Sequence, residues 1–148
     1  MSEFSAGERL TLYQLLVEQT NVVGATRRDT SRFFLTFHTA AFGGIGFAMT
    51  NPDQFPQILL AGLAFGMVVV SMLWFMLIRY YGRIVSAKFE VIHDLEKKFE
   101  IQPFLTEVRK VWRHKTPTIA ATTLEASIPL LFALGHGALG VTILLRST

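Results

Sequence analysis

The chain contains no cysteine, and only 17% of its 148 residues are charged. The absence of cysteine excludes disulfides and thiolate metal sites, and it leaves the redox environment open. A soluble domain usually carries about a quarter charged residues. Because the hydrophobic fraction is 51%, the shortage of charge indicates either a membrane protein or an unusually apolar core.

Charge is scarcest in three long stretches. Residues 33–50 and 58–78 contain no Asp, Glu, Lys or Arg, and residues 119–145 contain only Glu125. A helix needs about 20 apolar residues to cross the hydrocarbon core of a bilayer. We therefore expect three transmembrane helices. The alternative, a buried helical hairpin in a soluble protein, would leave too little polar surface for a chain of this length.

The expected fold class is an all-α integral membrane protein, formed as a single membrane domain over residues 1–148. Apolar residues at spacings of three and four predict that the second span continues as one helix into a cytoplasmic extension. A short amphipathic helix is expected over residues 104–112. The expected segments are a cytoplasmic amphipathic helix over 1–31, a first span over 32–50, an external loop over 51–57, a second span over 58–78, a cytoplasmic helical segment over 79–117 and a third span over 118–145.

The distribution of Lys and Arg predicts the orientation in the membrane. All of these residues except Arg146 lie in segments 1–32 and 79–118. The positive-inside rule then places the N-terminus in the cytoplasm and the C-terminus outside, in a cell inner membrane. The net charge of +3 does not indicate a nucleic-acid partner, because the basic residues flank membrane ends and are mixed with acidic ones.

The last apolar stretch carries a polar stripe, which we define as Thr122, Glu125 and His136. Their spacing places them on one face of a helix, and polar groups of this kind avoid lipid. Depth along the first and third spans predicts that Glu125 meets either His38 or the hydroxyls of Thr36 and Thr39, whereas His136 has no assigned partner. The stripe either joins helices or lines a pore, and the residues alone leave both functions open.

Two further sets of residues indicate contacts. Glycines in the first two spans permit close helix approach: Gly43, Gly44, Gly46, Gly62 and Gly66. An apolar row beyond the second span could contact another protomer or an unidentified cytoplasmic partner: Phe89, Ile92, Leu95 and Phe99. The run HDLEKKFE, residues 93–100, indicates a solvated face with internal ion pairs, such as Asp94 with Lys97 or Lys98.

The sequence contains no catalytic, metal or cofactor motif. There is no phosphate loop and no nucleophile–base set, and neither His93 nor His114 has a second ligand at metal spacing. We therefore expect a protein that is not an enzyme and that uses no metal and no cofactor.

Three blocks resemble the RipA family of octameric small integral membrane proteins. They are RRDTSRFFLTFHTA at the first span, RYYGRIVSAKFEVIHDLEKKF after the second, and TLEASIPLLFAL in the third. The resemblance runs from about Leu10 to Leu134. It implies a bacterial ring-like homo-octamer of unassigned biochemistry that contacts membrane lipids.

Two functions remain open at this point. The protein is either a structural or interaction assembly with a cytoplasmic helical crown, or a channel or channel-like effector gated from the cytoplasm. A ring of carboxylates from Glu125 would suit the channel.

Overall fold

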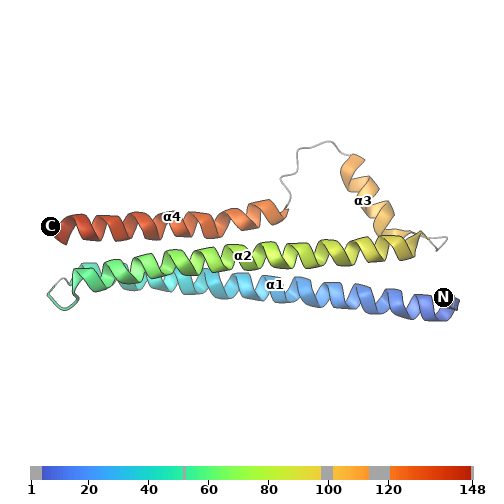
Figure 1. The fold of residues 1–148 in the computed structure, drawn as a ribbon, viewed down its shortest axis with the longest axis horizontal. Helices are drawn as coiled ribbons and strands as arrows, with labels where there is room; N and C mark the ends of the chain where they lie inside the picture. Colours follow the sequence, from blue (N-terminus) through green and yellow to red (C-terminus); the bar gives the residue numbers. More distant parts are fainter. Residues whose placement is uncertain (1–4, 52, 98–101, 114–120, 148) are drawn as a thin grey trace. The chain divides into compact units, whose positions relative to one another are not determined.

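The computed structural model describes residues 5–51, 53–97, 102–113 and 121–147, and these residues form four helices and no strand. Helix α1 spans Ala6–Met49, α2 spans Gln57–Glu96, α3 spans Pro103–Arg113 and α4 spans Ala121–Ser147 (Figure 1). The predicted all-α class is confirmed over these residues.

The first helix joins two segments that the sequence distinguished. The predicted amphipathic helix over 1–31 and the predicted span over 32–50 adjoin, and α1 runs through both as one helix of 44 residues. The polarity of the sequence changes near Arg32, yet no proline or turn signal interrupts the backbone there, so the ladder of hydrogen bonds continues. Ser5 and Glu8 begin this helix with a reciprocal capping box.

The other helices agree better with their sequence signals. Helix α2 runs unbroken for 40 residues, which confirms that the second apolar stretch continues into a long helical extension. Helix α3 occupies the segment in which the short amphipathic helix was predicted. Phe99, expected at the end of the long helix, lies outside the described residues.

The chain divides into two compact units. One comprises Met1–Arg27 and Tyr80–Ile119, and we call it the α3 unit. The other comprises Arg28–Arg79 and Ala120–Thr148, and we call it the α4 unit. Helices α1 and α2 are each divided between the two units, α1 after Arg27 and α2 after Arg79.

Buried positions in the α4 unit alternate at spacings of three and four residues. A mean spacing of 3.5 is typical of helices that pack at small crossing angles, with side chains of one helix inserted between those of the next. On α2 these positions are Leu60, Ala64, Met67, Ser71, Trp74 and Ile78, and Ala61 beside the first of them is buried as well. On α4 they are Ala126, Pro129, Ala133, His136, Gly140 and Ile143.

The core of the α4 unit contains two apolar clusters. The first joins α1, α2 and α4 through Ile45, Ala64 and Ile143, together with their neighbours. The second surrounds Trp74, Ile78 and Ala126. Because the first cluster takes side chains from all three helices, the second part of α1 packs alongside both α2 and α4.

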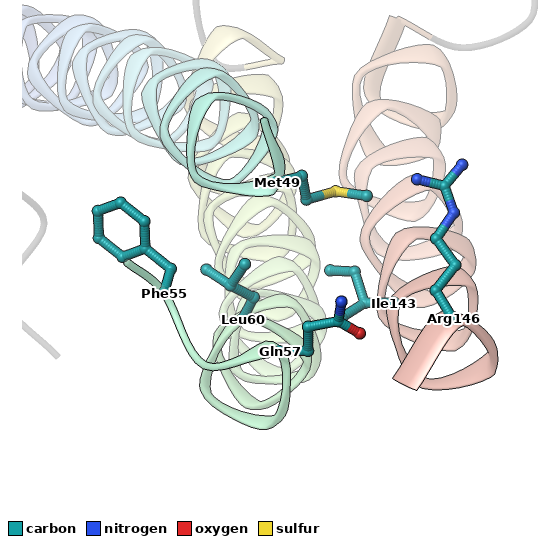
Figure 2. Close-up of a pocket in the computed structure, with 6 residues that line it drawn as sticks. All are labelled: Met49, Phe55, Gln57, Leu60, Ile143 and Arg146. Atoms are coloured by element: carbon teal, nitrogen blue, oxygen red, sulfur yellow. The ribbon is translucent and has the colours of Figure 1, made fainter. Parts of the chain in front are cut away.

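A small cavity lies at the end of the α4 unit where Met49, Leu60 and Ile143 converge, with Gln57 and Arg146 at its edge (Figure 2). Its volume is about 30 Å³, which is the space of one or two water molecules. It is therefore a packing gap rather than a ligand site.

Two of the described helices are long and apolar enough to cross a membrane, namely α2 and the Thr123–Arg146 part of α4. Helix α1 is not among them, because its apolar stretch is shorter and is interleaved with threonine, glycine and histidine. The outward faces are strongly apolar, and on α4 Leu131 and Leu134 expose about two thirds of their surface. Such faces suit contact with lipid or with another copy.

The close contacts inside the protomer use other glycines than those named from the sequence. At Gly43, Gly44, Gly46, Gly62 and Gly66 an added Cβ atom would meet nothing within 4 Å. At Gly135 of α4, by contrast, it would lie 2.8 Å from the ring of Phe42, and at Gly140 it would lie 3.1 Å from the ring of Phe65. Contacts between copies through the first five glycines stay a prediction.

Candidate functional site

Two histidines meet at the centre of the α4 unit. His38 of α1 and His136 of α4 are both fully buried, and Nδ1 of His38 lies 3.2 Å from Nε2 of His136. Ser71 of α2 is also fully buried, with its Oγ 3.4 Å from Nε2 of His38. One polar side chain from each helix thus forms a layer inside an otherwise apolar bundle.

The serine sets the direction of the hydrogen bonds in this layer. Ser71 donates its single hydroxyl hydrogen to the carbonyl of Met67 at 3.0 Å, so it accepts from Nε2–H of His38. Neutral His38 then has a bare Nδ1, which accepts from Nε2–H of His136. The far nitrogen of His136, Nδ1, is a buried acceptor with no partner among the described residues. The layer is therefore one chain of donors that all point the same way.

Aromatic rings enclose the histidine pair. The ring of Phe42 stacks on His136 with a centroid distance of 3.8 Å. Trp74 stacks on His38 at 5.7 Å, and Phe132 lies 5.0 Å from His38. These rings separate the imidazoles from the outer surface, so the polar layer is enclosed within the bundle.

The expected pairing of Glu125 with His38 is wrong, because both ring nitrogens of His38 face His136 and Ser71. The alternative pairing of Glu125 with Thr36 or Thr39 stays a prediction. Glu125 and His136 are separated by eleven residues of α4, or about 16 Å along the axis. The prediction measured depth from Arg32, where polarity changes. The packing of Ile45 with Ile143 sets the actual register of α1 against α4.

The polar stripe predicted on α4 is only partly described. His136 is buried and Glu125 is half-buried. Thr122 belongs to α4, but its side chain lies outside the described part of the structure. The stripe's role stays a prediction.

A second polar centre lies in the α3 unit, around Glu96. This carboxylate is fully buried at the end of α2. It accepts hydrogen bonds from the hydroxyl of Tyr13 at 3.0 Å and from the backbone N–H groups of Phe104 and Leu105 at 2.9 Å each. Because α3 begins at Pro103, these N–H groups belong to its first turn and have no intrahelical acceptor. The negative charge also suits the positive end of the helix dipole.

Sequence reasoning missed Glu96. The prediction of a solvated face over residues 93–100 is correct for Asp94 and Lys97, which form an exposed ion pair of 2.7 Å. It is wrong for Glu96. A usable signal was the start of a helix at Pro103, which requires a nearby acceptor for its first N–H groups.

The apolar row on α2 is used largely within the protomer. Ile92 is fully buried, Leu95 is half-buried, and the ring of Phe89 packs edge-on against Phe104 of α3 at 5.6 Å. Phe99 lies outside the described residues. A contact of this row with another copy or a partner stays a prediction.

Tyr13 should ionise at an unusually high pH. Burial, the hydrogen bond to Glu96 and the charge of Glu96 raise the pKa of Tyr13 from 10.0 to about 12. Because the folded pKa lies above the unfolded one, this contribution to stability is complete below pH 10 and is lost as the pH rises towards 12. In an alkaline titration followed by phenolate absorbance, one tyrosine should ionise near pH 12, and Tyr13→Phe should remove that step. Loss of the step in Tyr80→Phe instead would contradict the assignment.

The sequence was compared with models of known protein families. A family model described as "Octameric membrane protein family (8xMP)" matches residues 10–145. The chain belongs to this family. The match includes nearly all of α1, the whole of α2 and α3, and α4 as far as Leu145. No curated protein and no solved structure matches the chain.

Membership in the octameric membrane protein family makes the chain a membrane protein, consistent with the two apolar helices. Two residues of its histidine layer, Ser71 and His136, then lie on helices that are long and apolar enough to cross the membrane. Hydrogen bonds of this kind contribute about 0.6 kcal/mol each on average, and at most about 2. They also specify which helix faces meet, since a wrong register would leave the imidazoles unpaired.

Proposed function

We propose that the protein is a non-enzymatic structural assembly of the inner membrane. In this proposal it forms a ring-like homo-octamer, as the resemblance to the RipA family implies, and a cytoplasmic helical crown containing α3 binds a partner. The family description supports assembly into octamers in a membrane.

The observation that carries this proposal is the inward position of the histidines. A channel lined by the polar stripe would need its strongly polar groups on a face open to water. His38 and His136 are instead paired with each other and closed in by Phe42, Trp74 and Phe132. This arrangement favours a role in joining helices over a role in conduction.

The proposal includes three membrane spans, with the N-terminus in the cytoplasm. The packing of Ile45 and Ala48 of α1 against α2 and α4 supports a third span, because α1 is then embedded to the same depth as the two apolar helices. The concentration of Lys and Arg in segments 1–32 and 79–118 supports the orientation.

Contacts between copies are proposed to use the open glycines. Gly62 and Gly66 lie four residues apart on α2, and Gly43, Gly44 and Gly46 lie on α1, all with free space at the Cβ position. Such positions permit close approach of two membrane helices. They do not serve that purpose inside one protomer.

Enlarging the α2 glycines should therefore disrupt assembly without unfolding the protomer. The double variant Gly62→Leu and Gly66→Leu should retain its helical circular dichroism, because both glycines are exposed and nothing in the protomer lies within 4 Å of an added Cβ atom. Native mass spectrometry should show octamers for the wild type and smaller species for the variant. Ala138→Leu, at an exposed small residue of α4, is the control and should stay octameric. Intact octamers in the glycine variant would contradict this interface.

The channel alternative is tested on the same preparation. Verified octamers in planar bilayers should show no channel current, both with and without cell extract. A conductance that Glu125→Gln alters would overturn the structural assignment and favour a channel lined by Glu125.

A further inference from the structure

Helices α2 and α4 border a groove in the α4 unit with a volume of about 360 Å³. It is lined by Phe75, Arg79, Thr123, Ala126, Ser127 and Leu130. The bottom of the groove is closed by packed core side chains, because Ala126 belongs to the core cluster of Trp74 and Ile78. The groove is about ten times larger than the cavity near Arg146 and is open to the outside of the unit.

The groove has a polar end and an apolar end. Helices α2 and α4 are antiparallel here, since Leu60 shares a cluster with Ile143, and Trp74 shares one with Ala126. Arg79 and Thr123 therefore lie together at one end, and Phe75 and Leu130 lie further into the apolar part. A phospholipid has the same order of polarity, with a phosphate followed by acyl chains.

The charge at the polar end is available for a ligand. The guanidinium of Arg79 lies 5.6 Å from the centroid of the Phe75 ring, which holds it over the groove. It forms no ion pair within the described residues. Glu125 is not among the residues that line the groove. A guanidinium can bind a phosphate through two parallel hydrogen bonds, which a carboxamide cannot imitate.

Thr123 supplies a second group at this end. Its side chain is exposed and its hydroxyl can donate a hydrogen bond. The first turn of α4 contains no acidic residue, and its N–H groups have no acceptor within the helix, so this helix end adds a positive potential at the same place. Ser127 is already bonded to the carbonyl of Leu124 at 2.6 Å and contributes mainly shape.

We propose that this groove is a binding site for an anionic glycerophospholipid. Arg79 and Thr123 hold the phosphate, and Phe75 and Leu130 contact the first carbons of an acyl chain. Basic pockets between membrane helices on the side rich in Lys and Arg commonly bind such headgroups. The site depends on membrane embedding but not on the proposed structural function.

Lipid titration of the purified full-length oligomer tests the site. Dioleoylphosphatidylglycerol and dioleoylphosphatidylcholine are added separately in detergent, and bound lipids are counted by native mass spectrometry. The wild type should retain phosphatidylglycerol preferentially. Arg79→Gln should weaken its binding about tenfold, the effect expected for loss of a charge-assisted hydrogen bond, and Thr123→Val should weaken it less. Arg79→Lys should keep part of the affinity, because it keeps the charge.

Arg83→Gln is the matched control, since Arg83 is exposed one turn further along α2 and does not line the groove. Circular dichroism checks that each variant is folded. Equal binding of the two lipids by the wild type, or equal weakening in Arg79→Gln and Arg83→Gln, would overturn the proposal. Displacement of the lipid by millimolar inorganic phosphate would show a simple anion site. Dissociation of the oligomer in Arg79→Gln, with no lipid bound to the wild type, would show that a second copy occupies the groove.

Discussion

Replacing Glu96 by alanine is expected to destabilise the α3 unit by about 3 kcal/mol. The change removes one acceptor that serves three donors, namely the hydroxyl of Tyr13 and the N–H groups of Phe104 and Leu105. A donor left unpaired in a buried place costs about 1–3 kcal/mol, and partial hydration of the two N–H groups reduces the total. Hydrogen exchange at Phe104 and Leu105 should accelerate, and limited proteolysis should cut α3 sooner.

The conservative variant separates hydrogen bonding from charge at this position. Glu96→Gln keeps an amide oxygen that can accept, but its NH₂ group faces a donor, so about half of the loss is expected. Glu90→Ala is the control, because Glu90 is an exposed acid on the same helix. An effect of Glu96→Ala no larger than that of Glu90→Ala would show that α3 is held by its apolar contacts alone.

Replacing His136 by alanine should destabilise the α4 unit by about 3–5 kcal/mol. The change opens a cavity beside Phe42 and leaves Nδ1 of His38 buried without a donor. His136→Phe keeps the stacked ring and loses only the hydrogen bond, so it should cost about 1 kcal/mol. Thermal unfolding in detergent, followed by circular dichroism, measures both.

The exposed Leu134 provides the control for these histidine variants. Leu134→Ala removes a side chain of similar size from the same helix, but one that is 70% exposed. We expect the midpoint temperature of unfolding to fall slightly for this variant and strongly for His136→Ala. If the two variants lower the midpoint by the same amount, the histidine layer does not stabilise the bundle. If His136→Phe is as damaging as His136→Ala, the hydrogen bond matters more than the packing.

The helices were largely predictable because their signals are local. Apolar spacing at three and four residues correctly predicted the long α2 and the short α3. Helix α1 continues through Arg32, where the two predicted segments adjoin, because a change in side-chain polarity does not interrupt backbone hydrogen bonds. Polarity marks where the environment changes, whereas proline and turn residues mark where a helix ends.

The partners of the polar groups were not predictable in the same way. His38 was assigned to Glu125 by depth, but a shift of about three turns in the register of α1 against α4 brings it to His136. That register follows from the fit of Ile45, Ala64 and Ile143 in one cluster. Likewise, Glu96 looks solvated in the run HDLEKKFE and is buried because α3 and Tyr13 of α1 pack onto it.

The sequence by itself determined the membrane class, the helical composition and the long α2, since these depend on composition and on the spacing of residues within a single segment. Only the tertiary structure decided that His136 meets His38 and that Glu96 caps α3. It also decided which glycines lie at close contacts inside the protomer, namely Gly135 and Gly140 rather than Gly62 and Gly66. The physical reason is that each of these contacts joins residues far apart in the chain, and their pairing depends on how the helices slide and rotate to fill the core.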